Sequence, residues 1–140
     1  MEEPSSEKLE DNSNIERLKT KISFGIKFWL EFQDEGQKNI LGSGWAKLLE
    51  IIDDTVNSEP KSLTQAANEC GYSYKYAWSI LKKIKERTGK TPVETKKGGL
   101  GGGGWVKLND WGKYLLKTYK NLLTEIEGIE KKLEKSLKID

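Results

Sequence analysis

The side chains that most often carry enzyme chemistry are nearly absent from this sequence. Its 140 residues include one cysteine, Cys70, and no histidine. These counts exclude an intramolecular disulfide bond, most zinc sites and every catalytic triad that uses histidine. Asp53 and Asp54 are the best candidates for a carboxylate pair, but adjacent residues of a helix point in different directions. We therefore predict a protein that is not an enzyme and that needs no cofactor and no metal.

Chemistry of another kind is available between residues 73 and 97. This segment holds eight lysine and arginine residues against Glu86 and Glu94, although the whole chain has a net charge of only +2. Concentrated positive charge suits a phosphate-binding surface, but a solvated helix face can also be rich in lysine. Only Arg17 and Arg87 of the 24 basic residues are arginine. Lysine favours phosphate contacts over bidentate recognition of guanine.

The glycine-rich segment GGLGGGG follows directly after Lys96 and Lys97. Strand-like stretches at Pro92–Thr95 and Trp105–Leu108 flank it, which predicts a hairpin whose tip has almost no side chains. The segment lacks the Gly-Lys-Ser/Thr ending of a phosphate-binding loop, so nucleotide binding is weakly supported. A hairpin of this kind can lie against a DNA backbone, where N–H groups and lysines meet phosphates. A flexible linker is the alternative.

Three helices are predicted before this hairpin. Apolar residues recur at helical spacing after Ser43, which predicts a first helix from about Gly44 to Val56 with Ser43 as its N-cap. Ser62 and Gln65 form a capping-box pattern and predict a second helix at about 62–70. The third helix begins after Ser73 and ends at Thr88-Gly89. Its buried stripe is Ala77, Leu81 and Ile84, and its outward residues are Lys75, Tyr76, Ser79, Lys82, Lys83 and Glu86.

Two helices joined by the tight turn at Gly71 are typical of a helix-turn-helix, whose second helix enters the major groove of DNA. Helix pairs joined by glycine also occur in folds that bind nothing, so this alternative stays open. The predicted DNA-binding residues on the helices are Ser62, Thr64, Ser73, Tyr74, Lys75, Tyr76, Ser79, Lys82 and Lys83. On the hairpin they are Lys96, Lys97, Gly98 and Gly99.

Residues 1–20 are acidic and polar, and we expect a disordered tail with an ambiguous short helix near its end. From Phe24 to Phe32 apolar residues alternate with others, which predicts a strand that turns near Gly36 and returns at Lys38–Leu41. We expect Trp45, Trp78, Trp111 and Cys70 to be buried in the core. Trp29 falls on the polar face of the strand, so we expect it to meet a partner subunit or the C-terminal helix.

The last predicted helix begins after Asn109, its expected N-cap, and continues nearly to residue 140. Its apolar residues alternate spacings of four and three, as in a coiled coil. This seam predicts a homodimer, most strongly from Leu122 onward. For 114–119, packing onto the chain's own domain is a credible alternative. The predicted dimer residues are Trp29, Leu115, Tyr119, Leu122, Ile126, Ile129 and Leu133.

The segments GYSYKYAW, VETKKGGLGGGG and LNDWGKYLLKTY together resemble the DNA-binding domain of the ModE family of molybdate-responsive regulators, which is distantly similar to LysR-type regulators. The resemblance covers residues 40 to about 122. The start, KFWLEF before ILGSG, resembles short archaeal members. The resemblance to this family implies a winged helix-turn-helix, dimerisation through the long helix and transcriptional regulation. Because the chain ends in a lysine-rich helix, we expect a short form without a molybdate-binding region and with no identifiable small-molecule effector.

The expected fold is mainly α with small β hairpins, a winged helix-turn-helix with a long C-terminal dimerisation helix. We expect a tail at 1–20, a DNA-binding domain at 21–108 and a dimerisation helix at 109–140. The expected function is sequence-specific binding of double-stranded DNA as a homodimeric transcriptional regulator. The alternatives are an architectural protein with little sequence preference and a protein-interaction module without DNA contact. With no secretory signal and no apolar run long enough for a bilayer, we expect no membrane partner and a cytoplasmic, nucleoid-associated protein.

Overall fold

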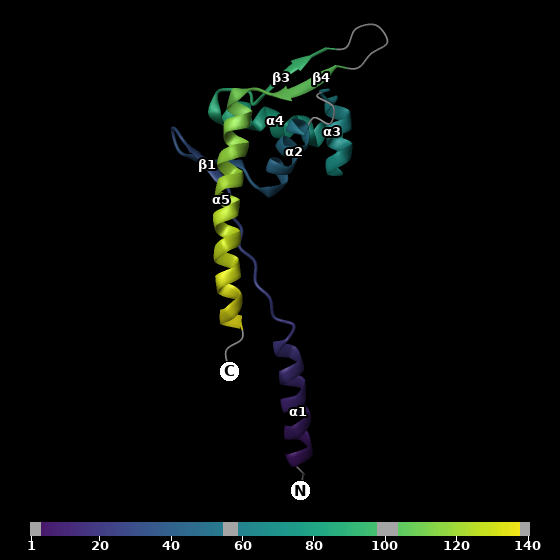
Figure 1. Cartoon of the computed structure of the whole chain (residues 1–140), viewed down its shortest axis with the longest axis vertical. Helices are drawn as coiled ribbons and strands as arrows, with labels where there is room; N and C mark the ends of the chain where they lie inside the picture. Colours follow the sequence, from purple (N-terminus) through teal and green to yellow (C-terminus); the bar gives the residue numbers. More distant parts are fainter. Residues whose placement is uncertain (1–3, 55–58, 98–103, 138–140) are drawn as a thin grey trace. The chain divides into compact units, whose positions relative to one another are not determined.

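The computed structural model describes residues 4–54, 59–97 and 104–137. The described part is mostly helical with two small antiparallel hairpins and a long C-terminal helix (Figure 1). In chain order the elements are α1 (Pro4–Lys19), β1 (Leu30–Gln33), β2 (Gln37–Leu41), α2 (Ser43–Asp53), α3 (Leu63–Cys70), α4 (Tyr74–Thr88), β3 (Val93–Lys96), β4 (Trp105–Leu108), α5 (Asp110–Glu134) and the short 3-10 helix η2 (Lys135–Leu137). This composition is compatible with the expected winged helix fold.

One compact unit, Lys27–Glu125, contains the core; Met1–Ile26 and Ile126–Asp140 form the other unit. Within the core α2 packs against α3 and β4, and α4 packs against α3 and β2. The first half of α5 contributes Leu115, Leu116 and Tyr119 to the same core, so this unit continues past the expected boundary at Leu108. Fully buried apolar side chains include Leu41, Leu48, Leu49, Ile52, Ile80, Ile84 and Val106.

The turn between α3 and α4 forms as predicted. The Ser62 hydroxyl accepts a hydrogen bond from the Gln65 backbone N–H at 3.0 Å, and Ser73 does the same for Tyr76 at 3.1 Å. Between the two helices Gly71 adopts φ +78°, a left-handed conformation that only glycine takes without strain. Two caps and one glycine therefore fix the angle at which α4 leaves α3.

The N-cap of α2 was predicted one residue too late. Gly42 is the cap, its carbonyl accepting the Ala46 N–H at 2.8 Å, and Ser43 is the first helical residue. Glycine is acceptable at an N-cap because the extended backbone of that position leaves the cap carbonyl free to begin the helix. The described helix ends at Asp53, and the predicted end at Val56 lies outside the described residues.

The β1–β2 hairpin is shorter than predicted. Leu30 pairs with Leu41, and α2 begins two residues later, so no partner strand remains for the residues before Leu30. The alternation predicted from Phe24 still holds in burial, because Phe24, Ile26 and Phe28 are half-buried and the residues between them are exposed. Phe28 stacks on Tyr119 with ring centroids 4.6 Å apart.

The predicted second hairpin is present, with β3 shifted one residue toward the C-terminus. Val93 pairs with Leu108 and Lys96 with Trp105. Its glycine-rich tip, including Gly98 and Gly99, lies outside the described residues. After the hairpin the Asn109 side chain accepts the Gly112 N–H at 2.9 Å, which confirms Asn109 as the N-cap of α5.

The N-terminal segment differs from the expected disordered tail, since Pro4–Lys19 is the helix α1. Residues 12–20 are exposed along its second half. Glutamate, lysine, leucine and arginine all have high helix propensity, which permits a helix without burial. Low hydrophobicity alone therefore does not distinguish a solvated helix from a disordered segment.

Candidate nucleic-acid interface

Successive residues of α4 are turned by about 100° around the helix axis, so its side chains divide into four lines. One line is buried in the core and contains Ala77, Ile80, Leu81 and Ile84. Opposite the core lie Lys75, Ser79, Lys82 and Glu86. Between these two lines are two flanks, one formed by Tyr74, Trp78 and Lys85 and the other by Tyr76, Lys83 and Arg87.

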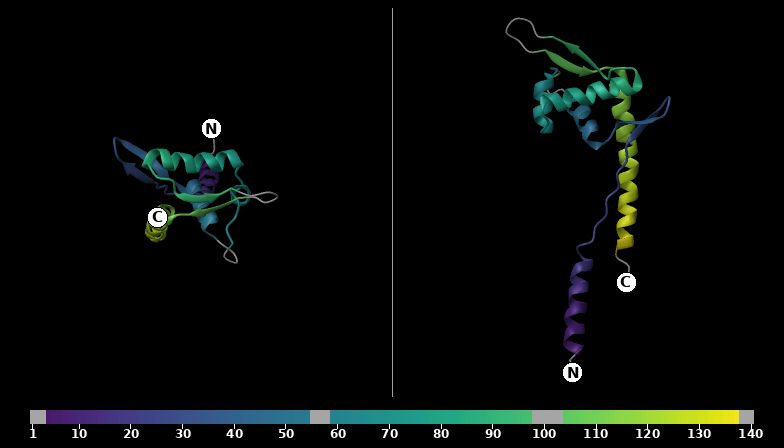
Figure 2. Two further views of the ribbon diagram at one scale, coloured as in Figure 1. Left: turned by 90° about the horizontal axis from the view of Figure 1, so that it is seen from above. Right: turned by 180° about the vertical axis from the view of Figure 1, so that it is seen from behind.

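The flank with Trp78 faces the β3–β4 hairpin, and the helix and hairpin run side by side (Figure 2). Two grooves lie between them and share Trp78 and Thr95. One groove brings together five predicted DNA-binding residues, which are Ser62, Thr64, Tyr74, Lys96 and Lys97. The other groove adds the predicted residue Lys82, together with Lys85. The start of α3, the helix α4 and the β3–β4 hairpin thus form one basic surface.

The side chains on the opposite flank of α4 contact other residues of the same chain. The Lys83 ammonium lies 5.9 Å and the Arg87 guanidinium 5.5 Å from the centre of the Trp45 ring. Arg87 also donates a hydrogen bond to the Asn39 carbonyl at 2.6 Å. The Tyr76 ring meets Tyr72 edge-on at 5.0 Å. Lys83 and Tyr76 are therefore on a different side of α4 from the hairpin.

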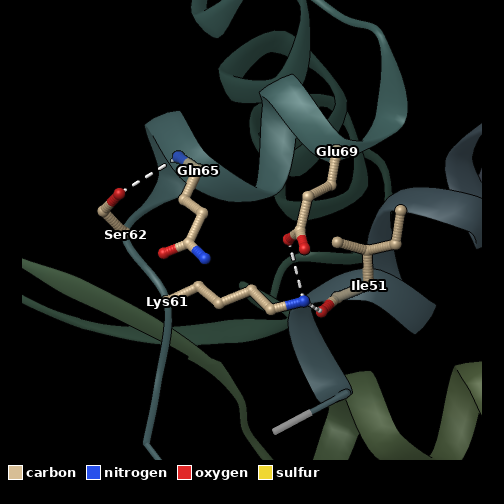
Figure 3. A network of polar contacts seen from close by, with 5 residues as sticks. All are labelled: Ile51, Lys61, Ser62, Gln65 and Glu69. Atoms are coloured by element: carbon tan, nitrogen blue, oxygen red, sulfur yellow. Dashed lines mark hydrogen bonds and ion pairs between the residues drawn. The ribbon is translucent and has the colours of Figure 1, made fainter. Parts of the chain in front are cut away.

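A buried lysine fixes the position of the hairpin relative to the helices. Lys61 is only 9% exposed, and its ammonium donates to the Ile51 carbonyl at 3.0 Å and lies 2.8 Å from the Glu69 carboxylate (Figure 3). The backbone carbonyl of the same residue accepts the Val106 N–H at 2.9 Å, which joins the Lys61 backbone to β4 by an isolated antiparallel bridge. Lys61 thus connects α2, α3 and the hairpin through a single residue.

The remaining predicted site residues differ in how free their polar groups are. Lys75 and Thr64 are exposed. The Ser62 and Ser73 hydroxyls are occupied as helix caps, and the Ser79 hydroxyl donates to the Tyr76 carbonyl at 2.7 Å. Capping hydroxyls still have a proton to donate, so they can contact a phosphate without giving up their helix.

The prediction that Trp78 lies in the core was wrong, because its side chain is 48% exposed between the two grooves. Trp45 and Trp111 are half-buried and pack against the core as expected. The sequence contains a signal for this exception: Trp78 is one residue after Ala77 in the buried stripe and shares its flank with Lys85, seven residues on. Lys85 and Trp105 were also missed as groove residues.

The predicted dimer residues fall into two groups. Leu115 and Tyr119 are buried in the chain's own core, in line with the alternative that residues 114–119 pack onto their own domain. Leu122, Ile129 and Leu133 are exposed and Ile126 is half-buried. Trp29 is half-exposed and donates its indole N–H to Glu31 at 2.8 Å. Among the predicted dimer residues of α5, the exposed ones therefore begin at Leu122.

The surface between α4 and the hairpin is basic. Its one acidic lining residue among those described, Glu86, lies 4.0 Å from Lys82 in a solvent-exposed pair that contributes little. Cys70, by contrast, is buried as predicted, and burial raises the pKa of its thiol, which keeps the thiol protonated and unreactive at neutral pH. In the described ranges no helix is both long and apolar enough to cross a bilayer.

Comparison with known proteins gives a partial match. No family model matches the chain. Over 66 residues, 47% of this chain, it is 38% identical to the DNA-binding transcriptional dual regulator ModE of Escherichia coli K12. It matches the transcriptional regulators ModE of Escherichia coli O157:H7 and Shigella flexneri equally well. The chain spans only 24% of the length of these regulators. The match supports a ModE-like DNA-binding domain in this chain.

Proposed function

We propose that this chain is a transcriptional regulator, without enzymatic activity, that binds specific sites in double-stranded DNA as a homodimer. In this proposal α3 and α4 form a helix-turn-helix, α4 enters the major groove, and the β3–β4 hairpin is a wing on the DNA backbone. The observation that carries the proposal is the basic surface that α4 and the hairpin form together. The similarity to the ModE regulators supports it.

The arrangement of α4 matches what a recognition helix requires. Its N-terminal residues Lys75 and Ser79 point away from the core, where they can reach base edges. Lysines on α4 and on the hairpin can both contact phosphates, which hold the helix in position but do not distinguish sequences. We assign base contacts to the outward line of α4 and backbone contacts to Lys96 and Lys97.

The homodimer is supported by the second half of α5. Its exposed apolar residues continue the face that the first half buries in the core, so an unpartnered helix would leave this face in water. A second copy would cover it and present a second α4 to the next major groove, about 34–36 Å away along the DNA. Sedimentation at micromolar concentration tests this, and a monomer at all concentrations would contradict it.

DNA binding is tested by fluorescence anisotropy with a 30-base-pair duplex over a range of salt concentrations. Removal of one lysine that binds a phosphate should reduce the slope of log K against log salt by about 0.9. The double variant Lys96→Gln/Lys97→Gln should lower the slope and weaken binding to all duplexes alike. Lys113→Gln/Lys117→Gln, which changes two exposed lysines of α5, is the matched control. No binding at low salt would refute the proposed function.

An architectural DNA-binding protein is the second candidate, and one observation favours it. Arg87 is engaged with Trp45 and Asn39, and neither groove is lined by arginine. Arginine is the side chain that most often recognises guanine, so specificity would depend on lysine, serine and tyrosine. Selection of bound duplexes from a random pool separates the candidates: a sharp consensus favours the regulator, and uniform recovery favours the architectural protein.

A further inference from the structure

The two grooves on either side of Trp78 are neighbours that share the lining residues Trp78 and Thr95, and together we call them the trough. The first extends from Ser62 at the start of α3, and the second reaches Gly89 at the end of α4. Since α4 has 15 residues, the trough follows a helix about 22 Å long. One wall is α4 and the other is the hairpin, and Trp78 on α4 and Thr95 on the hairpin line both grooves.

Charges and apolar surface are distributed along this trough in a particular way. Lysines rise on both walls, Lys82 and Lys85 from α4 and Lys96 and Lys97 from the hairpin. Leu81, Val93 and Val106 contribute apolar surface lower down, since each is buried. A sugar-phosphate chain has matching properties, because its phosphates carry negative charge and its deoxyriboses are largely apolar.

Trp78 is the large aromatic side chain at the centre of the trough. Half of its surface is exposed, and its indole N–H has no hydrogen-bond acceptor among the described residues. An indole offers both a flat apolar face and one strong donor. It lies about 60° around α4 from Lys75 and about 100° from Ser79, on the hairpin side of the outward line.

These placements lead to a specific assignment, which rests on the proposed function. When a helix lies in the major groove and a hairpin lies on the neighbouring backbone, the strand that separates them must pass between the two elements. We propose that one sugar-phosphate strand of the duplex lies in this trough and that Trp78 anchors it, its ring packing on a deoxyribose and its N–H donating to a phosphate. Trp78 is then a sequence-independent contact.

The test measures binding of wild-type and variant proteins to a random-sequence 30-base-pair duplex. Trp78→Ala should weaken binding roughly tenfold at every salt concentration, as expected for removal of an aromatic side chain that the bound duplex covers. Because this change removes no ion pair, the salt slope should stay at the wild-type value, whereas Lys85→Ala, on the same flank of α4, should lower it by about 0.9. Trp78→Phe, which keeps a ring but lacks the donor, should weaken binding about threefold.

Two controls make the result specific. Tyr114→Ala removes an exposed aromatic residue from α5 and should leave binding unchanged. The fluorescence of Trp78, measured as the difference between the emission of wild type and of Trp78→Phe, should change when duplex is added. This signal reports on Trp78 without requiring the alanine variant to fold.

Three results would overturn the assignment. In the first, Trp78→Ala binds as well as wild type. In the second, it loses affinity only for a selected sequence, which would make Trp78 a base contact. In the third, its loss is confined to a single-stranded 30-mer, which would indicate stacking on bases. If wild type binds no duplex, the proposed function fails before any variant is compared, and the assignment fails with it.

Discussion

The two halves of α5 have the same apolar spacing but different surroundings. In the first half Leu115 is 3% exposed and packs in the core, while in the second half Leu133 is 41% exposed. A seam with alternating spacings of four and three residues shows only that one face of a helix is apolar. Whether that face meets the helix's own domain or a second copy depends on where the domain ends, which the spacing does not encode.

The largest expected effect comes from truncating a seam leucine inside the core. Leu115→Ala should lower the free energy of unfolding by about 3 kcal/mol, because it opens a cavity that the core cannot fill. This loss should be the same at all protein concentrations. Denaturant unfolding at two concentrations measures it.

Leu133→Ala is the matched change in the other half. Its cost should depend on protein concentration, since in the proposed homodimer the contact that it removes lies between two copies. The distinction between the halves fails if both variants respond to concentration in the same way.

A glycine in each half provides the next comparison. The backbone of Gly112 lies against the Pro92 carbonyl, and a Cβ there would collide with that backbone oxygen. Gly112→Ala should therefore destabilise the protein by about 2 kcal/mol, because α5 must move away from the start of the hairpin. Thermal unfolding followed by circular dichroism measures the loss, and an unchanged Tm would show that α5 can shift without cost.

Gly128, in the second half, has open space where a Cβ would be. Gly128→Ala should stabilise the helix by up to about 1 kcal/mol, because alanine loses less backbone entropy than glycine in a helix interior. The helical signal should rise slightly and melt later. A destabilised variant would mean that the helix needs this glycine for a bend.

The smallest effect is confined to alkaline solution. Burial raises the pKa of Tyr119 above its ordinary value of 10.0, so the folded protein favours the neutral phenol. The resulting stability is present below pH 10.0 and is lost as the pH rises through that value and beyond. Tyr119→Phe should reduce this alkaline loss while its stability at pH 7 stays close to wild type. Unfolding curves between pH 7 and 11 measure the difference, and parallel curves for both proteins would contradict it.

Local signals in the sequence predicted much of the fold. The caps at Ser62, Ser73 and Asn109 depend on residues three positions apart, and all three formed. The errors came from features that depend on distant partners. Strand β1 could not extend back to Phe24 because β2 has only five residues.

The candidate site was predicted only in part, because it too depends on residues that are distant in the sequence. Lysines on α4 and on the hairpin were identified by type, but only the fold brings Lys82 and Lys96 to the walls of one trough. Hydrophobicity assigned Trp78 to the core, although its position one residue after Ala77 places it on a flank. Lys61 had no distinguishing pattern at all, since its role depends on contacts with Ile51, Glu69 and Val106.

The absence of arginine from the described lining of the trough has a consequence for how this protein would search DNA. An ammonium group is a point charge that attracts every phosphate similarly, whereas a guanidinium holds its partner in a fixed forked geometry. A surface of lysines therefore offers a smooth energy profile along the duplex, with low barriers between neighbouring registers. We expect rapid sliding and short pauses, with residence time on a given site set by the few side chains that reach base edges. Tracking of single labelled molecules on stretched DNA would measure both the diffusion coefficient and the pauses.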